Sequence, residues 1–241
     1  MKKLLVVLLA AAMVFSMASC KENTTKKSEG VMTYAQYVAA PLESEVTVEC
    51  YVQDHQSWWD NKITVYAQDG DGGYFLYNMA CAEADAAKLV PGTKIKVKGY
   101  KSEWSGEVEI IDGTFEIEKG KYIAAAKDVT ADYGTDKFLN HANQFIALKG
   151  LTVEASKNAD GQDVAFLYNW DGSGEPGSDL YFNVSLNGKT YNFTVESYLR
   201  GKDTDVYKAV EGLKVGDKID LEGFLYVYEQ PQAHVTKVTV K

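Results

Sequence analysis

Histidine and cysteine, two residue types that often act in catalysis and in metal binding, occur only three times each in this sequence. Its three histidines, His55, His141 and His234, belong to different expected elements. The sequence contains no Walker A, HExxH, GxSxG or paired CxxC motif, the local patterns of phosphate binding, zinc proteolysis, serine hydrolysis and thiolate metal sites. We therefore expect no enzymatic activity, no catalytic residue and no cofactor. A hydrolase of unrecognised type is the alternative.

Two short runs carry carboxylates of the kind that a calcium loop uses. Residues 69–72 read Asp-Gly-Asp-Gly, and residues 171–174 read Asp-Gly-Ser-Gly. Neither run is followed by the spaced oxygen ligands and terminal glutamate of an EF-hand loop. Tight turns also favour Asp-Gly pairs, because the aspartate side chain hydrogen-bonds the turn backbone and glycine adopts a positive φ. We expect a turn at both places and no metal site.

The N-terminus combines two lysines, Lys2 and Lys3, with an apolar run over residues 4–17. A membrane-spanning helix needs about 20 apolar residues, so this shorter run indicates a secretory signal peptide. The sequence Met17-Ala18-Ser19-Cys20 is similar to the lipobox of exported bacterial lipoproteins. The resemblance implies cleavage before Cys20 and acylation of that residue. Cleavage by ordinary signal peptidase, with Cys20 uninvolved, is the alternative.

The expected lipid would hold the protein outside the cytoplasmic membrane of a bacterium. Two acyl signals give stable anchoring where one does not. Residues 1–19 would then be the lipoprotein signal peptide and residues 20–30, which are polar and lack periodicity, a tether. We expect a protein of the bacterial cell envelope whose membrane contact is the lipid on Cys20.

The two remaining cysteines allow two interpretations. Cys50 shares a predicted strand face with Val46 and Val48 and should point into a core, whereas Cys81 opens a short helical segment. In an oxidising compartment a pair of cysteines suggests a disulfide bridge between Cys50 and Cys81. Free cysteine is also among the most buried residue types, so two buried reduced thiols are the alternative.

The composition, with 46% hydrophobic and 24% charged residues, is that of a globular protein. Twenty-five basic against 34 acidic residues give a net charge of −9. Loss of residues 1–19 removes two lysines and changes this to 23 − 34 = −11. Proteins that bind nucleic acid usually carry a basic field that attracts phosphate. From charge alone we do not expect nucleic acid as a partner.

An internal repeat divides the chain into two domains, expected at residues 31–126 and 127–241. Residues 89–100 align without gaps on residues 213–224, sharing a Leu-x-x-Gly-x-Lys-Ile-x-x-x-Gly pattern followed by an aromatic residue. Each block follows a short helical segment and precedes a further strand. Residues 46–52 alternate between apolar and polar side chains with the period of a strand. We expect eight further strands at residues 62–68, 74–77, 107–117, 145–155, 164–168, 180–186, 189–196 and 233–240.

Three strands, a helix and two strands resemble the OB-fold, a five-stranded Greek-key barrel. The repeated block is similar to the junction of helix and strand 4 in OB domains of exported bacterial lipoproteins. The expected fold class is all-β with short helices, as two tandem five-stranded OB-fold-like barrels. Gly99 and Gly223 interrupt their strands where a small barrel bends. A pair of small β-sandwiches is the alternative.

The resemblance also indicates where a ligand would bind, because the loops between strands 1–2 and 4–5 of an OB-fold flank one cleft. In domain 1 these loops carry Trp58, Trp59 and Trp104, with Tyr100 just before the second loop. The equivalent loops of domain 2, expected at residues 156–161 and 228–232, carry no tryptophan. We expect the recognition surface on domain 1, with domain 2 bracing it. The alternative is that Trp58 or Trp59 caps the barrel or packs on domain 2.

The sequence as a whole predicts a lipid-anchored, extracytoplasmic binding or interaction module whose ligand is a peptide, a glycan or a protein. Two compact β domains without catalytic motifs suit that role. A single-stranded nucleic-acid-binding OB protein is the alternative, because many OB-folds hold single strands in an aromatic groove. Lys94, Lys96 and Lys98 share one strand face, but a row of lysines is ordinarily a solvated edge.

Overall fold

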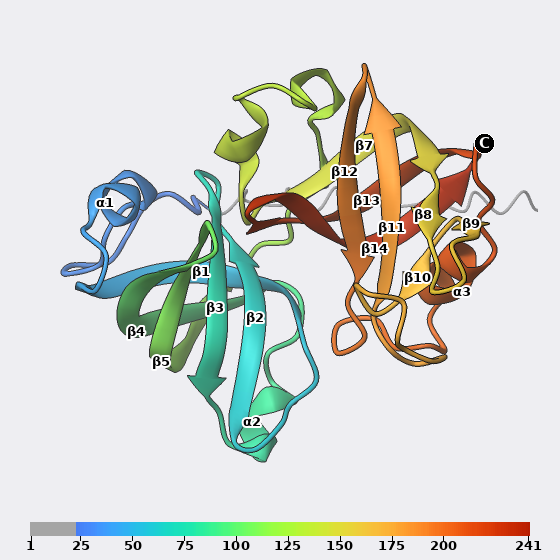
Figure 1. Cartoon of the computed structure of the whole chain (residues 1–241). Helices are drawn as coiled ribbons and strands as arrows, with labels where there is room; N and C mark the ends of the chain where they lie inside the picture. Colours follow the sequence, from blue (N-terminus) through green and yellow to red (C-terminus); the bar gives the residue numbers. More distant parts are fainter. Residues whose placement is uncertain (1–22) are drawn as a thin grey trace, which may run out of the picture.

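The computed structural model describes residues 23–241, which form two five-stranded barrels side by side (Figure 1). The first barrel is closed, with its strands in the order β1-β2-β3-β5-β4. Neighbouring strands are antiparallel except β3 and β5, which are parallel where Phe75 lies opposite Glu109. The strands are β1 (Glu45–His55), β2 (Lys62–Gln68), β3 (Gly73–Ala80), β4 (Thr93–Trp104) and β5 (Glu107–Lys121).

The second barrel repeats this connectivity strand for strand. Its pairings run β7-β11-β12-β14-β13 and return to β7, and the one parallel contact in the ring is again between the third and fifth strands, where Thr194 lies opposite His234. The strands are β7 (Phe145–Glu154), β11 (Leu180–Leu186), β12 (Lys189–Val195), β13 (Lys218–Tyr228) and β14 (Gln230–Val240). The predicted fold class, two tandem OB-fold-like barrels, is confirmed.

A short helix separates the third and fourth strands of each barrel, as the sequence predicts. These helices are α2 (Glu83–Ala86) and α3 (Asp205–Glu211). The repeated block places β4 and β13 at equivalent positions, and each strand has a register shift at its glycine, beside Gly99 and at Gly223. Such a bulge bends a strand and increases its twist, which helps a small barrel to close.

The remaining elements are short. Helix α1 (Tyr34–Ala39) begins at a capping box in which the Thr33 side chain accepts from the Gln36 backbone and the Gln36 side chain accepts from Thr33. No helix within residues 23–241 is long and apolar enough to span a membrane. The other elements are β6 (Lys127–Asp128), β8 (Ser156–Lys157), β9 (Asp163–Val164), β10 (Leu167–Tyr168) and the 3-10 helices Thr130–Asp132 and Phe138–His141.

Part of the expected tether lies against the first barrel. The Nζ atom of Lys27 is 2.6 Å from Oδ2 of Asp69 and donates to the backbone oxygen of Glu49 at 2.8 Å. Asp69 is the first residue of the predicted Asp-Gly-Asp-Gly turn, where its other carboxylate oxygen accepts from the Asp71 and Gly72 backbones. Because both members of the ion pair are buried, residues 23–30 are held at the Asp69 turn.

Each barrel has its own apolar core, and a third apolar cluster joins the two barrels. Tyr66 on β2 stacks on Phe224 of β13 with ring centroids 4.6 Å apart. The hydroxyl of Tyr66 lies 2.6 Å from Nδ1 of His234 on β14. Phe75 on β3 contacts Tyr226 edge to face at 5.2 Å. All five rings come from the outer faces of their barrels, so the second barrel covers the outer face of β2 and β3 around Tyr66 and Phe75.

Backbone groups complete the contact between the barrels. The side-chain oxygen of Gln68 accepts a hydrogen bond from the Phe145 backbone at 2.9 Å. A Cβ at Gly73 would lie 2.1 Å from the backbone oxygen of Asn143, so this position requires glycine. The backbones of the two barrels therefore approach each other more closely than a side chain at position 73 would allow.

Glu107 is a buried carboxyl group in this interface. Its side chain is fully buried, one oxygen accepts from the Val227 backbone at 2.8 Å, and the other has no hydrogen-bond partner among the described residues. Burial raises the pKa of Glu107 to about 8. The protonated form, which avoids burying a charge, therefore predominates at neutral pH in the folded protein.

This pKa predicts that the protein loses stability between pH 6.5 and 8. The folded state binds a proton at Glu107 that the unfolded chain has already released, so stability falls as pH rises towards 8, by about 1.5 kcal/mol over this interval. Glu196, with a pKa raised to about 7 by burial, adds a smaller loss. The pKa of His234, lowered by burial to about 3, affects stability at lower pH, below its unfolded value of 6.5.

Urea unfolding at pH 6.5 and pH 8 measures this loss. Glu107→Gln keeps an acceptor for Val227 and should remove most of the pH dependence. Glu116→Gln, at an exposed position on β5, should leave it unchanged. A fall in Glu107→Gln as steep as in the wild-type protein would contradict the assignment to this carboxyl group.

Candidate functional site

The aromatic residues that the sequence places at a ligand site have different environments. Trp58 packs against the core of the first barrel, and its indole nitrogen donates to the Cys81 backbone oxygen at 2.9 Å. Trp59 and Trp104 are exposed, with 77% and 62% of their surfaces accessible. The structure therefore assigns Trp58 the capping role that the sequence left open, and leaves two tryptophans in contact with solvent.

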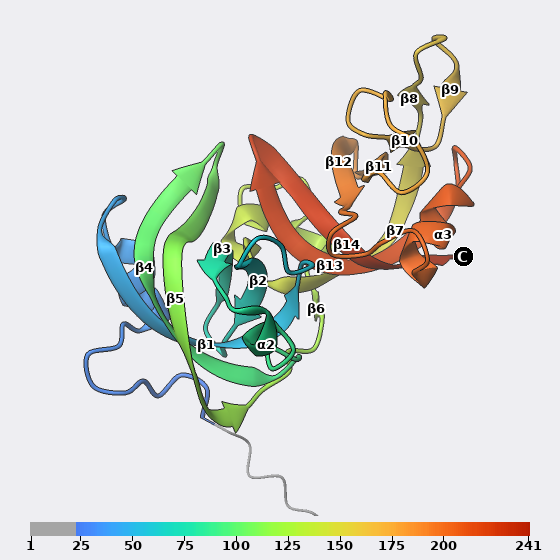
Figure 2. The same cartoon turned by 90° about the horizontal axis from the view of Figure 1, so that it is seen from below.

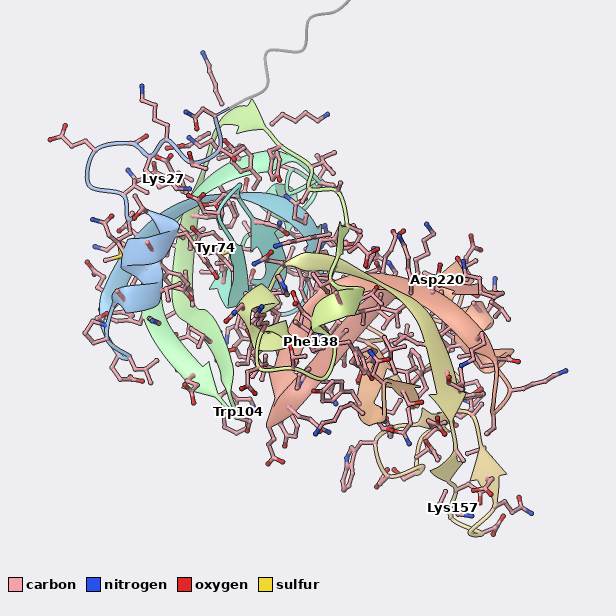
Figure 3. The ribbon with its side chains drawn as sticks, turned by 90° about the horizontal axis from the view of Figure 1, so that it is seen from above. Lys27, Tyr74, Trp104, Phe138, Lys157 and Asp220 are labelled. Carbon is pink, nitrogen blue, oxygen red and sulfur yellow. The ribbon has the colours of Figure 1, made fainter. Side chains whose placement is uncertain are left out.

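These residues do not form one surface. Trp104 lies at the end of the β4–β5 hairpin (Figure 3), whereas Tyr100 lies in the middle of β4, opposite Glu45 and Ile111. Within residues 23–241, no ring contact joins any two of the four predicted aromatic residues. The prediction of a single aromatic site built from both loops of domain 1 has no support in their geometry.

The cleft between these two loops contains the second barrel. The loop after β1 contacts it through the Ser57 backbone nitrogen, which donates to Tyr198 at 2.8 Å. The loop after β4 contacts it through Ser105, whose backbone oxygen accepts from Glu229. Seen from below, the β13–β14 hairpin lies beside the β4–β5 hairpin (Figure 2). The face on which an OB-fold ordinarily holds its ligand is therefore already covered in the first barrel.

The equivalent cleft of the second barrel is open. Its loop between strands 1 and 2 runs over residues 155–179 and carries Trp170, and Tyr228 ends strand 4 immediately before the turn to strand 5. Tyr181 lies on the outer face of β11 between them, and Glu229 and Gln232 complete the lining. The cleft has a volume of about 480 Å³. We call these five residues the aromatic cleft.

The loop that presents Trp170 is held by hydrogen bonds between its own residues. Asn169 has a φ of 58°, and its backbone nitrogen donates to the Asp179 oxygen at 2.9 Å. The side chain of Asp171 accepts from the Ser173 backbone at 3.0 Å. Hydrogen bonds from the side chain and then the backbone of Ser173 lower the pKa of Asp171. The predicted Asp-Gly-Ser-Gly turn is thus confirmed as a turn, and it leaves 76% of the Trp170 surface exposed.

Tyr181 and Tyr228 add two phenol rings to this surface. Burial, together with the carboxylates of Asp179 and Glu196, raises the pKa of Tyr181 to about 12. Its hydroxyl therefore stays protonated across the physiological range and is able to donate a hydrogen bond. Tyr228 is 44% exposed and immediately precedes Glu229, which has a positive φ of 58° at the tip of the hairpin. The three rings come from three different segments of the barrel.

Sequence reasoning missed Trp170 because it assigned a barrel strand to residues 164–168. The structure has only two-residue strands there, β9 and β10, within the long loop. The Asn187-Gly188 turn was the signal that could have found the residue. It identifies β11 and β12 as the barrel's second and third strands, so everything between β7 and β11 belongs to the loop that flanks the cleft.

The predicted cysteine residues lie outside this site. Cys50 and Cys81 are both buried free thiols, so the structure supports the alternative to a disulfide bridge. Burial raises the pKa of each thiol. Cys20 and the expected signal peptide, residues 1–19, lie outside the described residues.

Comparison with known proteins yields likeness of fold only. No protein-family model and no curated protein matches the sequence. Among solved structures, a murine DNA-binding protein bound to double-stranded DNA is 12% identical with a TM-score of 0.34, covering 81% of this chain and 96% of that one. The Ifi202 HINa domain in complex with a 20-base-pair double-stranded DNA is 11% identical with a TM-score of 0.35, covering 82% and 98%.

This comparison corrects one expectation drawn from the sequence. Net charge led us not to expect nucleic acid as a partner, yet both of these proteins are described bound to double-stranded DNA. The exclusion of nucleic acid is wrong on this finding. The class of ligand has to be argued from the side chains of the cleft instead of the charge of the whole chain.

Proposed function

We propose that the chain is a binding protein, not an enzyme, and that it holds a strand-like ligand in the aromatic cleft of its second barrel. One observation carries this proposal. Each barrel has one cleft of the kind in which an OB-fold binds its ligand. The cleft of the first barrel is covered by the second barrel, whereas the cleft of the second barrel is open and flanked by Trp170, Tyr181 and Tyr228.

The ligand that fits this cleft is a chain of units, each of which presents a flat face to an aromatic ring. OB-folds bind oligonucleotides and oligosaccharides between these two loops. Bases stack on aromatic side chains with little dependence on sequence, and sugar rings present flat C–H faces to the same rings. Gln232 and Glu229 offer hydrogen-bonding groups at the edge of the stacked surface. Single-stranded nucleic acid and oligosaccharide are therefore the two sources that we test.

Trp170→Ala should weaken ligand binding by roughly tenfold to a hundredfold. Stacking of one base on an aromatic side chain is worth about 1–3 kcal/mol. Trp104→Ala removes another exposed tryptophan from outside the cleft and is the matched control. Fluorescence anisotropy with a labelled oligothymidylate of about 12 nucleotides would measure nucleic-acid binding by both variants. Calorimetry with neutral oligosaccharides would measure their sugar binding.

The two ligand classes differ in how their binding affinity responds to salt. The affinity for oligosaccharide should not change with salt concentration. Oligonucleotide binding should weaken only slightly as salt rises, because neither lysine nor arginine is among the residues that line the cleft. Binding of either probe that weakens in Trp170→Ala and persists in Trp104→Ala supports the proposal. Equal effects of the two substitutions, or no binding of either probe, would overturn it.

We also propose that the protein is a lipoprotein of the bacterial cell envelope, anchored outside the cytoplasmic membrane. The proposal rests on the sequence Met17-Ala18-Ser19-Cys20 after a positively charged, apolar N-terminus. An anchored binding protein would present its cleft to ligands in the extracytoplasmic space.

Cys20→Ala should abolish acylation. The substitution removes the thiol that the lipid would modify, so the variant should stay unprocessed or be released from the membrane fraction. Metabolic labelling with radioactive palmitate in a bacterial host, followed by fractionation, measures both effects. A wild-type protein that carries no label would refute the lipid anchor and leave the proposal for the aromatic cleft untouched.

A further inference from the structure

A second pocket lies where the two barrels meet, apart from the aromatic cleft. Its walls combine Gln56, Ser57 and Trp59 from the loop after β1 with Tyr198 from the loop after β12. Lys62, Ile63 and Thr64 of β2 and Asn78 of β3 form the remaining lining. The volume is about 260 Å³, suited to one small ring-shaped group. We call it the seam pocket.

Two exposed aromatic rings stand at this pocket on rigid backbone. Trp59 and Lys62 exchange two backbone hydrogen bonds of 3.1 and 2.9 Å, and Asp60 and Asn61 between them both have positive φ. This geometry is that of a tight two-residue hairpin turn. Tyr198 is held by its backbone oxygen, which accepts from the Ser57 backbone. Trp59 and Tyr198 are nevertheless 77% and 63% exposed.

Uncharged polar groups line the interior of the pocket. The Thr64 hydroxyl contacts Oδ1 of Asn78 at 3.4 Å and accepts from the Asn78 backbone at 3.1 Å, which fixes the asparagine and leaves its amide nitrogen as a donor. The Gln56 amide nitrogen lies 3.5 Å from the Tyr66 hydroxyl. Lys62 is the one charged residue of the lining. The chain as a whole carries a net charge of −9, whereas no carboxylate lines this pocket.

We infer that the seam pocket binds one neutral sugar residue. A pyranose ring has a flat C–H face that packs on an aromatic ring and hydroxyl groups at its edge that exchange hydrogen bonds with amides and hydroxyls. Trp59 and Tyr198 supply the aromatic surface, and Gln56 and Asn78 supply the polar edge, with Asn78 held in place by the buried Thr64 hydroxyl. The near absence of charge in the lining favours a neutral sugar over an acidic one. The site requires both barrels and does not depend on the proposed function of the aromatic cleft.

Saturation-transfer NMR with methyl glycosides of glucose, galactose and mannose tests this inference on the whole protein. We expect transfer to the ring C–H protons of at least one sugar. Trp59→Ala should weaken its binding by about tenfold or more, which corresponds to about 1.4 kcal/mol. Asn78→Ala should weaken it as well. Trp104→Ala and Trp170→Ala remove exposed tryptophans from elsewhere and should leave it unchanged.

The exposure of Trp59 means that its replacement should leave the fold intact, which circular dichroism of each variant verifies. Absence of transfer to every neutral sugar would overturn the inference. Transfer that persists in Trp59→Ala would do so as well. Adenosine and thymidine serve as competing probes: binding of a nucleoside, but of no sugar, that is lost in Trp59→Ala would assign the pocket to a base instead.

Discussion

The stacking of Tyr66 between the two barrels is the contact on which the rest of the structure depends. Its ring lies against Phe224, and its hydroxyl lies within hydrogen-bonding distance of His234. Burial holds His234 neutral, so the imidazole pairs with the phenol without a buried charge. Around this contact Gly73 allows backbone to approach backbone. The two barrels therefore meet as matched surfaces.

This contact decides which parts of the molecule are available to ligands. The outer face of β2 and β3, the usual ligand face of an OB-fold, is used inside the chain as the docking face for β13 and β14. The same docking brings Tyr198 next to the loop of Trp59 and leaves the loop of Trp170 free. The two barrels share one connectivity but differ in access to ligands, because the second barrel covers the ligand face of the first and keeps its own cleft open.

The sequence predicts the barrels well because their signals are local. Alternation marks residues 62–68 and 180–186 with the bounds of β2 and β11, and the repeated block marks β4 and β13. The candidate site is predicted poorly because it depends on contacts between distant residues. Nothing local to Tyr66 says that Phe224 will cover it. Residues 164–168 form a short apolar run of the kind that is typical of a buried strand, but β11 pairs directly with β7 and leaves them in the loop between those two strands.

The central claim is that a strand-like ligand binds in the aromatic cleft of the second barrel and not on the part of the first barrel's β2–β3 face that the second barrel covers. Photo-crosslinking measures this directly, with an oligothymidylate and an oligosaccharide that each carry a photoreactive group and peptide mapping by mass spectrometry. The account predicts crosslinks at Trp170, Tyr181 or Tyr228 with at least one of the two probes. Crosslinks at Tyr66 or Phe75 would show that the barrels separate to bind, and would contradict the account.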